Sequence, residues 1–185
     1  MRLNARRIGI LTTDGFDDAA LNFLREELRS QGAEVRLLSL LPDSVQGWSR
    51  EGWSDRQAVD LVLDDVALTD FDALVIPPGL IAVDTLKATR YAVNFVSRFA
   101  AGHRLVVAIG HAPLFLNEAG LIRGRTVTGT RSIRTELRNA GAHVREDGPR
   151  RDGMLITAAD NGELLLTVNA IADGFMTERS TPEAA

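Results

Sequence analysis

The 185-residue sequence contains no cysteine, and this absence restricts its chemistry more than any motif does. Without cysteine the chain can form neither disulfides nor thiolate metal sites, and it has no thiol nucleophile. Asp14, Asp17 and His111 could in principle surround an ion, but their spacing follows no metal motif. We therefore expect neither a metal nor a cofactor.

Long apolar runs are also absent. No stretch of 18 apolar residues predicts a membrane-spanning helix, and the opening "MRLNARRIGI" lacks the apolar core and cleavage site of a signal peptide. The formal net charge of −4 argues against nucleic acid or an anionic membrane as the main partner. We expect a cytoplasmic protein that binds neither.

Apolar, β-branched segments alternate with amphipathic ones along most of the chain, which predicts an α/β doubly wound, mostly parallel sheet with helices on both faces. Residues 42–68 interrupt the alternation, and two tryptophans and the run "VDLVL" predict a small β-excursion on the sheet. We expect one domain over 1–176 and a polar tail over 177–185. The expected strands cover 7–13, 33–41, 71–79, 104–109, 125–128, 142–145 and 154–160. The expected helices cover 17–32, 91–102, 112–119, 132–140 and 161–175.

In such a sheet, ligands bind beyond the carboxyl ends of the strands, where neighbouring loops share one crevice. The expected loops bring residues 12–17 together with Pro78, Gly79, Gly110 and His111. The stretch "LVVAIGHAPLFLNEAG" (105–120) runs from a strand through a tight turn into a helix, a corner at which many enzymes hold a nucleophile. Free amides at the helix start favour an anion or a developing oxyanion there.

Several ordered segments carry a family resemblance. "FDALVIPPG", "VVAIGHAP", "SIRTELRNAGA" and "VQGWSREGW" together resemble the ThiJ/PfpI superfamily, in particular its PfpI-type branch of intracellular proteases and stress proteins, over about residues 6–157. The resemblance implies a flavodoxin-like sandwich of the class I glutamine amidotransferase-like type, commonly assembled as dimers or hexamers. It also implies an elbow of the form Ala-Ile-Cys-His-Gly-Pro, an acidic residue at the first helix and a glycine amide in an oxyanion hole.

Carried over to this chain, the acidic position falls on Asp17, where the family more often has Glu. The oxyanion glycine falls on Gly79, the histidine on His111 and the cysteine nucleophile on Gly110. Because glycine adopts positive φ without a side-chain clash, the exchange removes the thiolate while leaving the turn intact. Other family positions have also changed: Pro78 and Ala112 replace glycines, Thr130 and Arg131 replace an aromatic-proline pair, and "LITAADNGELL" lacks the usual Ser-Arg and Pro-Asp elements.

Each candidate also has a purely structural explanation. Gly110 suits any tight turn, Asp17 is a favoured N-cap, and a histidine at a helix start is often structural. Trp48 and Trp53 could form a ligand platform, although we favour their burial against a partner subunit.

The polar neighbours of these candidates suggest no replacement chemistry. Thr13 and Ser132 are the nearest hydroxyls, but neither has a recognisable base and orienting group. Asp14 and Asp18 are expected to be solvated.

We therefore expect a PfpI-like stress-response protein that is non-catalytic. It would be a homodimer or higher homo-oligomer that binds a small anionic or carbonyl ligand, or a partner, at Asp17, Gly79, Gly110 and His111. The alternative is a weak cysteine-independent hydrolase or hydratase, of peptidase, deglycase or glyoxalase type, in which His111 and Asp17 position a water. A third possibility is a structural role with an occluded pocket.

Overall fold

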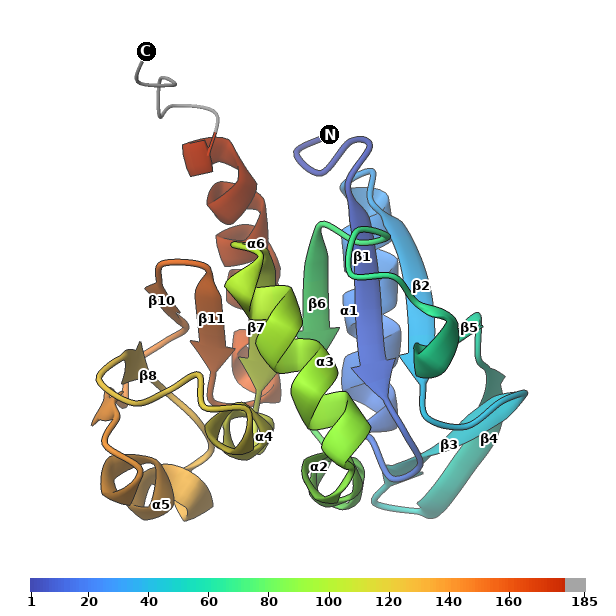
Figure 1. Ribbon diagram of the computed structural model, residues 1–185. Helices are drawn as coiled ribbons and strands as arrows, with labels where there is room; N and C mark the ends of the chain where they lie inside the picture. Colours follow the sequence, from blue (N-terminus) through green and yellow to red (C-terminus); the bar gives the residue numbers. More distant parts are fainter. Residues whose placement is uncertain (179–185) are drawn as a thin grey trace.

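The computed structural model describes residues 1–178, so the predicted polar tail lies outside the described residues from residue 179 onward. A seven-stranded sheet with the order β10-β11-β7-β6-β1-β2-β5 forms the centre (Figure 1). All its strand pairs are parallel except β10 with β11. Its strands are β1 (Arg7–Thr12), β2 (Glu34–Ser39), β5 (Leu61–Val62), β6 (Ala73–Ile76), β7 (Leu105–Ile109), β10 (Arg150–Asp152) and β11 (Leu155–Ala158).

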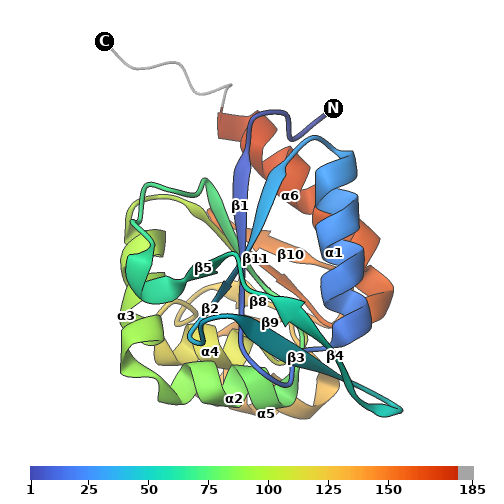
Figure 2. The same ribbon diagram turned by 90° about the vertical axis from the view of Figure 1, so that its right-hand side faces the viewer.

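Helices cover both faces of the sheet, with α1 and α6 on one side and α2, α3 and α4 on the other (Figure 2). The α-helices are α1 (Asp18–Ser30), α2 (Leu80–Ala88), α3 (Arg90–Ala101), α4 (Pro113–Glu118), α5 (Arg134–Asn139) and α6 (Leu164–Glu178). Single 3₁₀ turns are η1 (Leu63–Asp65), η2 (Arg131–Ile133) and η3 (Asn161–Glu163). The predicted flavodoxin-like, doubly wound fold is confirmed.

Strand β7 shows why its sequence is apolar throughout. Leu105, Val107 and Ile109 pack under α1 and α6, whereas Val106 and Ala108 pack under the opposite helices. Successive side chains of a strand point to opposite faces, so a strand covered on both sides needs an apolar residue at every position.

Two elements were not predicted, and three others differ in form from the prediction. The missed elements are helix α2, which directly follows Gly79 and has no single apolar face, and strand β10, which has the charged sequence "RRD". The strands expected near 125–128 and 142–145 are β8 (Thr126–Val127) and β9 (His143–Val144), which pair with each other in a separate sheet. The helix expected over 132–140 begins as η2 and continues as α5.

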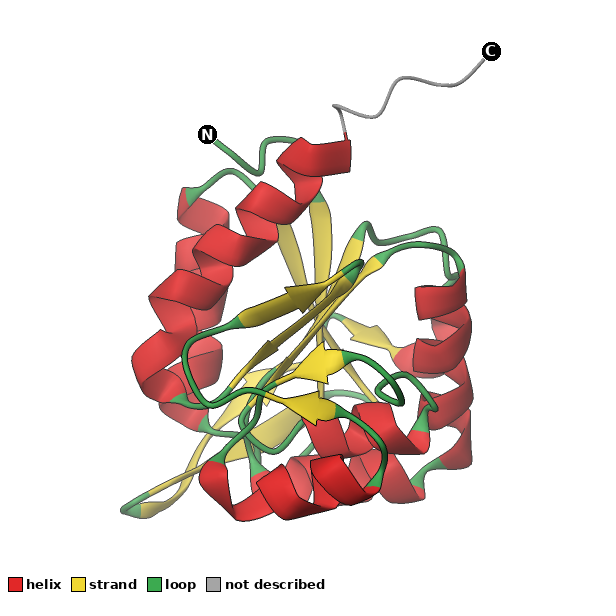
Figure 3. Ribbon diagram, turned by 90° about the vertical axis from the view of Figure 1, so that its left-hand side faces the viewer, coloured by secondary structure: helices red, strands yellow, loops and turns green. Residues whose placement is uncertain are grey.

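The β-excursion predicted within 42–68 is a hairpin of β3 (Ser44–Ser49) and β4 (Gly52–Ala58), followed by β5 and η1. The hairpin forms its own two-stranded sheet beyond the carboxyl ends of the central strands (Figure 3). Two carboxylates hold it in place: Asp14 Oδ1 accepts from the Gln46 amide at 2.7 Å, and Asp18 Oδ1 accepts from Gln57 Nε2 at 2.8 Å. Asp14 and Asp18 were expected to be solvated, but both are half-buried and tie this hairpin to the β1–α1 loop and to the first residue of α1, respectively.

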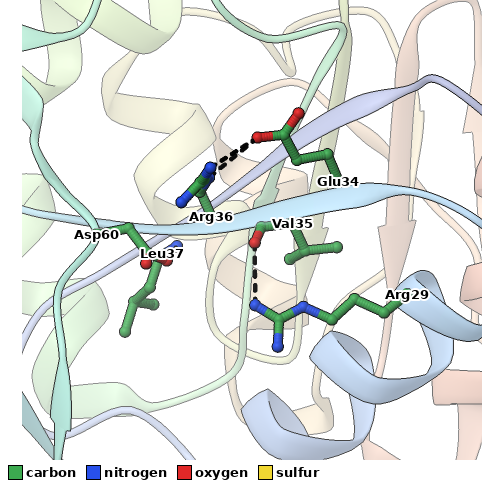
Figure 4. A network of polar contacts seen from close by, with 6 residues as sticks. All are labelled: Arg29, Glu34, Val35, Arg36, Leu37 and Asp60. Carbon is green, nitrogen blue, oxygen red and sulfur yellow. Dashed lines mark hydrogen bonds and ion pairs between the residues drawn. The ribbon is translucent and has the colours of Figure 1, made fainter.

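The chain leaving the hairpin is fixed to strand β2 (Figure 4). Asp60 Oδ2 accepts from the Leu37 amide at 2.6 Å, and the Asp60 amide donates to the Leu37 carbonyl at 2.9 Å. Arg29 Nη2 donates to the Val35 carbonyl at 3.2 Å and so ties α1 to the same strand. The hairpin is thus secured at both of its ends.

No helix within residues 1–178 is long and apolar enough to cross a membrane.

Candidate functional site

A cavity of about 750 Å³ opens at the carboxyl ends of β1, β6, β7 and β11, where the sheet meets α2 and the hairpin in the lower part of Figure 1. All four residues that the sequence singled out, Asp17, Gly79, Gly110 and His111, line it. The remaining wall residues are Gly15, Trp48, Pro78, Leu80, Ile81, Thr130, Ala159, Asp160, Asn161 and Gly162. The cavity is open, which argues against the occluded pocket of the third expectation.

Gly79 permits two loops to touch at the base of this cavity. It has φ +142°, and a Cβ on it would lie 2.5 Å from the Phe16 Cα and 2.7 Å from the Gly15 carbonyl oxygen. This contact lets the Asp17 amide donate to the Pro78 carbonyl at 2.8 Å. Only glycine fits this position, since both the backbone angle and the space exclude a side chain.

Gly110 occupies the corner between β7 and α4, as predicted. Its φ is +68°, its amide donates to the Ala158 carbonyl at 2.9 Å, and its carbonyl accepts from the Thr130 amide at 3.0 Å. A Cβ at this position would lie 2.8 Å from the Cβ of buried Pro78. Backbone hydrogen bonds therefore hold the corner in shape, and the neighbouring proline lies too close to leave normal room for a side chain at residue 110.

Asp17 is held by two hydrogen bonds and caps a helix. Its Oδ1 accepts from the Ala20 amide at 2.9 Å, which makes it the N-cap of α1, and its Oδ2 accepts from Asn161 Nδ2 at 2.9 Å. The capping role is thus observed, and the carboxylate lines the cavity at the same time.

His111 is half-buried, and its Nε2 lies 3.3 Å from Ser132 Oγ. Burial lowers the pKa of the imidazole below its usual value, and the charge of Glu136 offsets part of this effect. A lowered pKa keeps the ring neutral near pH 7, so that it can accept a hydrogen bond. Ser132 therefore has a base within reach, but no hydrogen bond from a third group orients the His111 ring among the described residues, and Ser132 does not line the cavity.

Two backbone amides remain available at the cavity. Among the described residues, neither the Gly79 nor the His111 amide donates a hydrogen bond. Both residues line the cavity, and unpaired backbone amides are common donors to a carbonyl or developing oxyanion.

Three wall residues were missed as site residues or assigned elsewhere. Trp48 reaches the cavity because its amide donates to the Phe16 carbonyl at 2.6 Å, which continues the hairpin alongside the β1–α1 loop. Its ring meets Trp53 edge-on at 5.3 Å, and each tryptophan is about half exposed (47% and 50%). Asp160 and Asn161 follow β11 and reach the cavity by the rule that loops at strand ends converge, a signal that the sequence did contain.

The wall carries negative but no permanent positive charge. Asp17 and Asp160 are its carboxylates, and no lysine or arginine of the described chain lines it. Within residues 1–178 no group of three His, Asp or Glu side chains could hold a metal ion.

Comparison with known proteins agrees with the fold. The family model for the DJ-1/PfpI family matches residues 6–173. Deglycase TK1284 of Thermococcus kodakarensis is 31% identical over 158 residues, 85% of this chain and 92% of that protein. General stress protein 18 of Bacillus subtilis is 34% identical over 140 residues, 75% and 79% of the two chains. A solved two-domain protein of Anabaena variabilis, with DJ-1/ThiJ/PfpI-like and ferritin-like domains, has a TM-score of 0.85 at 28% identity and covers 96% of this chain and 50% of its own.

The contact at Gly79 predicts a large loss of stability on adding one methyl group. Gly79→Ala should lower the free energy of unfolding by about 2–4 kcal/mol, because strain and overpacking act together. Gly52→Ala is the matched control: its φ is +116°, but nothing lies within 4 Å of its Cβ position. Urea unfolding should show the smaller loss for Gly52→Ala, and equal losses would contradict the proposed contact.

The corner at residue 110 predicts coupling between two substitutions. Gly110→Cys should destabilise the protein by about 1–3 kcal/mol more than Gly124→Cys, since Gly124 has a similar φ of +73° with nothing within 4 Å. Pro78→Gly should then recover at least about 1 kcal/mol in the Gly110→Cys background, in a double-mutant cycle measured by urea unfolding. Additive effects would show that Pro78 does not fill this space.

Proposed function

The chain belongs to the DJ-1/PfpI family, and from this premise we propose that it is a non-catalytic member, which has lost the cysteine nucleophile and binds a small ligand or a partner at the emptied elbow. The observation that carries the proposal is the corner at Gly110. It keeps a positive φ and its backbone hydrogen bonds, while a Cβ at this position would lie only 2.8 Å from the Cβ of Pro78, so the corner has little room for a nucleophilic side chain.

A carbonyl compound fits the cavity better than an anion. The unpaired amides of Gly79 and His111 suit one neutral oxygen, and a neutral imidazole at His111 adds an acceptor. Asp17 and Asp160 would repel an anion, and among residues 1–178 no lysine or arginine lines the cavity to offset them.

The biological setting is also part of the proposal. Relatives carry names such as deglycase and general stress protein, which supports a role in a stress response. We place the protein in the cytoplasm, as the resemblance to intracellular PfpI-type proteins implies. We propose no nucleic-acid or membrane partner, because the net charge of −4 disfavours binding to polyanions.

We further propose a homodimer or higher homo-oligomer. Trp53 is half exposed at the hairpin and does not line the cavity, which leaves it available to a partner subunit. Trp48 contacts both the cavity and Trp53, so a subunit bound at Trp53 would lie beside the pocket.

The alternative is a weak cysteine-independent hydrolase or hydratase of peptidase, deglycase or glyoxalase type. It is supported by the 3.3 Å contact of His111 Nε2 with Ser132 Oγ and by the two unpaired amides. His111 would act as general base on a water, with Asp17 as a nearby carboxylate. Since burial lowers the pKa of His111, such turnover would rise with pH as the ring loses its proton, and it would level off at a lower pH than for an ordinary histidine.

Turnover assays distinguish these two functions. Hydrolysis of peptides and conversion of small glyoxals should run at least about a thousandfold below a cysteine-bearing member of the family, because loss of a nucleophile removes most of the rate enhancement. Any residual rate should be the same in His111→Ala. A rate that falls in His111→Ala and follows the pH dependence above would instead support the alternative.

The oligomer proposal predicts a change of mass on altering one tryptophan. Trp53→Ser should shift the light-scattering mass toward that of the 20.1 kDa monomer, because a half-exposed aromatic at an interface carries much of the binding energy. Phe23→Ser, which removes another exposed aromatic from a different surface on α1, should leave the mass unchanged. A wild-type protein that is monomeric at high concentration would contradict the proposal.

A further inference from the structure

The charges around the cavity restrict its ligand more closely than its shape does. Asp17 extends from the β1–α1 loop and Asp160 from the β11–η3 loop, and both line the cavity. Asn161 donates to Asp17 Oδ2 at 2.9 Å and so connects the two loops. In the part of the chain that the structure describes, the wall therefore carries two carboxylates and no lysine or arginine.

Two of the helix starts at the cavity, those of α1 and η3, are already capped by these carboxylates, whereas α2 and α4 begin there without a side-chain cap. Asp17 Oδ1 accepts from the Ala20 amide at the start of α1, and Asp160 Oδ1 accepts from the Gly162 amide at 2.8 Å at the start of η3. An incoming carboxylate or phosphate would have to compete with them and would also be repelled. Two amides remain, those of Gly79 and His111, which is the number that a single neutral carbonyl oxygen accepts.

The same wall is suited to a cation. Asp160 is exposed, and its second carboxylate oxygen accepts no hydrogen bond from the described residues. Trp48 presents a half-exposed indole to the cavity, and an aromatic ring attracts an ammonium group at close range. Leu80 and Ile81 add exposed apolar surface from α2.

Resting on the proposed carbonyl-binding function, we propose that the pocket selects a small carbonyl compound that also carries a cationic amino group, and that it excludes carboxylates and phosphates. The carbonyl oxygen accepts from the Gly79 and His111 amides. The ammonium group faces Asp160 and Asp17, and the apolar part of the ligand packs between Trp48 and Ile81.

Three stable benzamides of similar size test this selectivity. N-(2-aminoethyl)benzamide is a cation at pH 7.5, N-(2-hydroxyethyl)benzamide is neutral, and hippurate is an anion, while all three keep the benzoyl carbonyl. Calorimetric or NMR titration of the full-length protein should give dissociation constants in that order, with the cation at least about tenfold tighter than the anion.

Variants assign the preference to the named carboxylates. Asp160→Asn keeps a good helix N-cap and should weaken the cation about fivefold while leaving the neutral compound within about twofold. Asp17→Asn serves as a second test with the same expectation. Asp84→Asn removes one exposed carboxylate from α2 outside the cavity and controls for net charge.

The outcomes separate this inference from the function on which it rests. Equal binding of the three compounds, tighter binding of hippurate, or a cation affinity unchanged in both Asp160→Asn and Asp17→Asn would overturn the charge selectivity and leave carbonyl binding intact. If none of the three binds, both proposals fail.

Discussion

The site depends on the close approach of two backbone corners, one at Gly79 and the other at Phe16 and Asp17. A single Cβ at residue 79 would lie 2.5 Å from the Phe16 Cα, so the contact exists only because that side chain is absent. The contact has two consequences. It allows the Asp17 amide to donate a hydrogen bond to the Pro78 carbonyl at 2.8 Å, and it places the start of α2 beside the start of α1. The hairpin then continues from Phe16 to Trp48 and closes the cavity wall. The cavity is thus built from backbone geometry, and it does not require the reactive side chain that the family elbow usually holds.

The corner at Gly110 shows how chemistry and shape can separate. The strand-to-helix turn is fixed by hydrogen bonds to Ala158 and Thr130, neither of which needs a side chain at residue 110. Pro78 has meanwhile filled the adjacent space, so the two positions form one steric unit. A protein altered in this way retains two unpaired amides and a cavity of about 750 Å³, but it has no nucleophile at the elbow. Our proposal of binding without turnover rests on this combination, and the proposed preference for a ligand that is not an anion rests on the carboxylates of the wall.

Much of this arrangement could be predicted from the sequence, and the exceptions have a common physical cause. The apolar run of β7 and the glycine after it are local signals, so the strand, the corner and the convergence of three loops were all expected. The role of Asp14 was not, because an aspartate in a loop is solvated unless a distant segment offers it a donor. Its partner, the Gln46 amide, lies 32 residues away in the hairpin. Trp48 was assigned to a partner interface for the same reason, since its position beside Asp17 follows from strand pairing with the β1–α1 loop. The edge strand β10 lacks apolar residues, and the apolar residues of α2 ("LIAVDTLKA") do not gather on one face, so α2 has no clear helical period.

The central claim is that the Gly79 and His111 amides form a working carbonyl site at an elbow without a nucleophile. The most direct measurement is an amide-resolved NMR titration of the protein with neutral N-(2-hydroxyethyl)benzamide. The account predicts saturable shifts of the Gly79 and His111 amide signals, with Gly52 on the hairpin and Gly124 beyond α4 unaffected. Saturable binding that leaves both amides unshifted, or no binding at all, would contradict it.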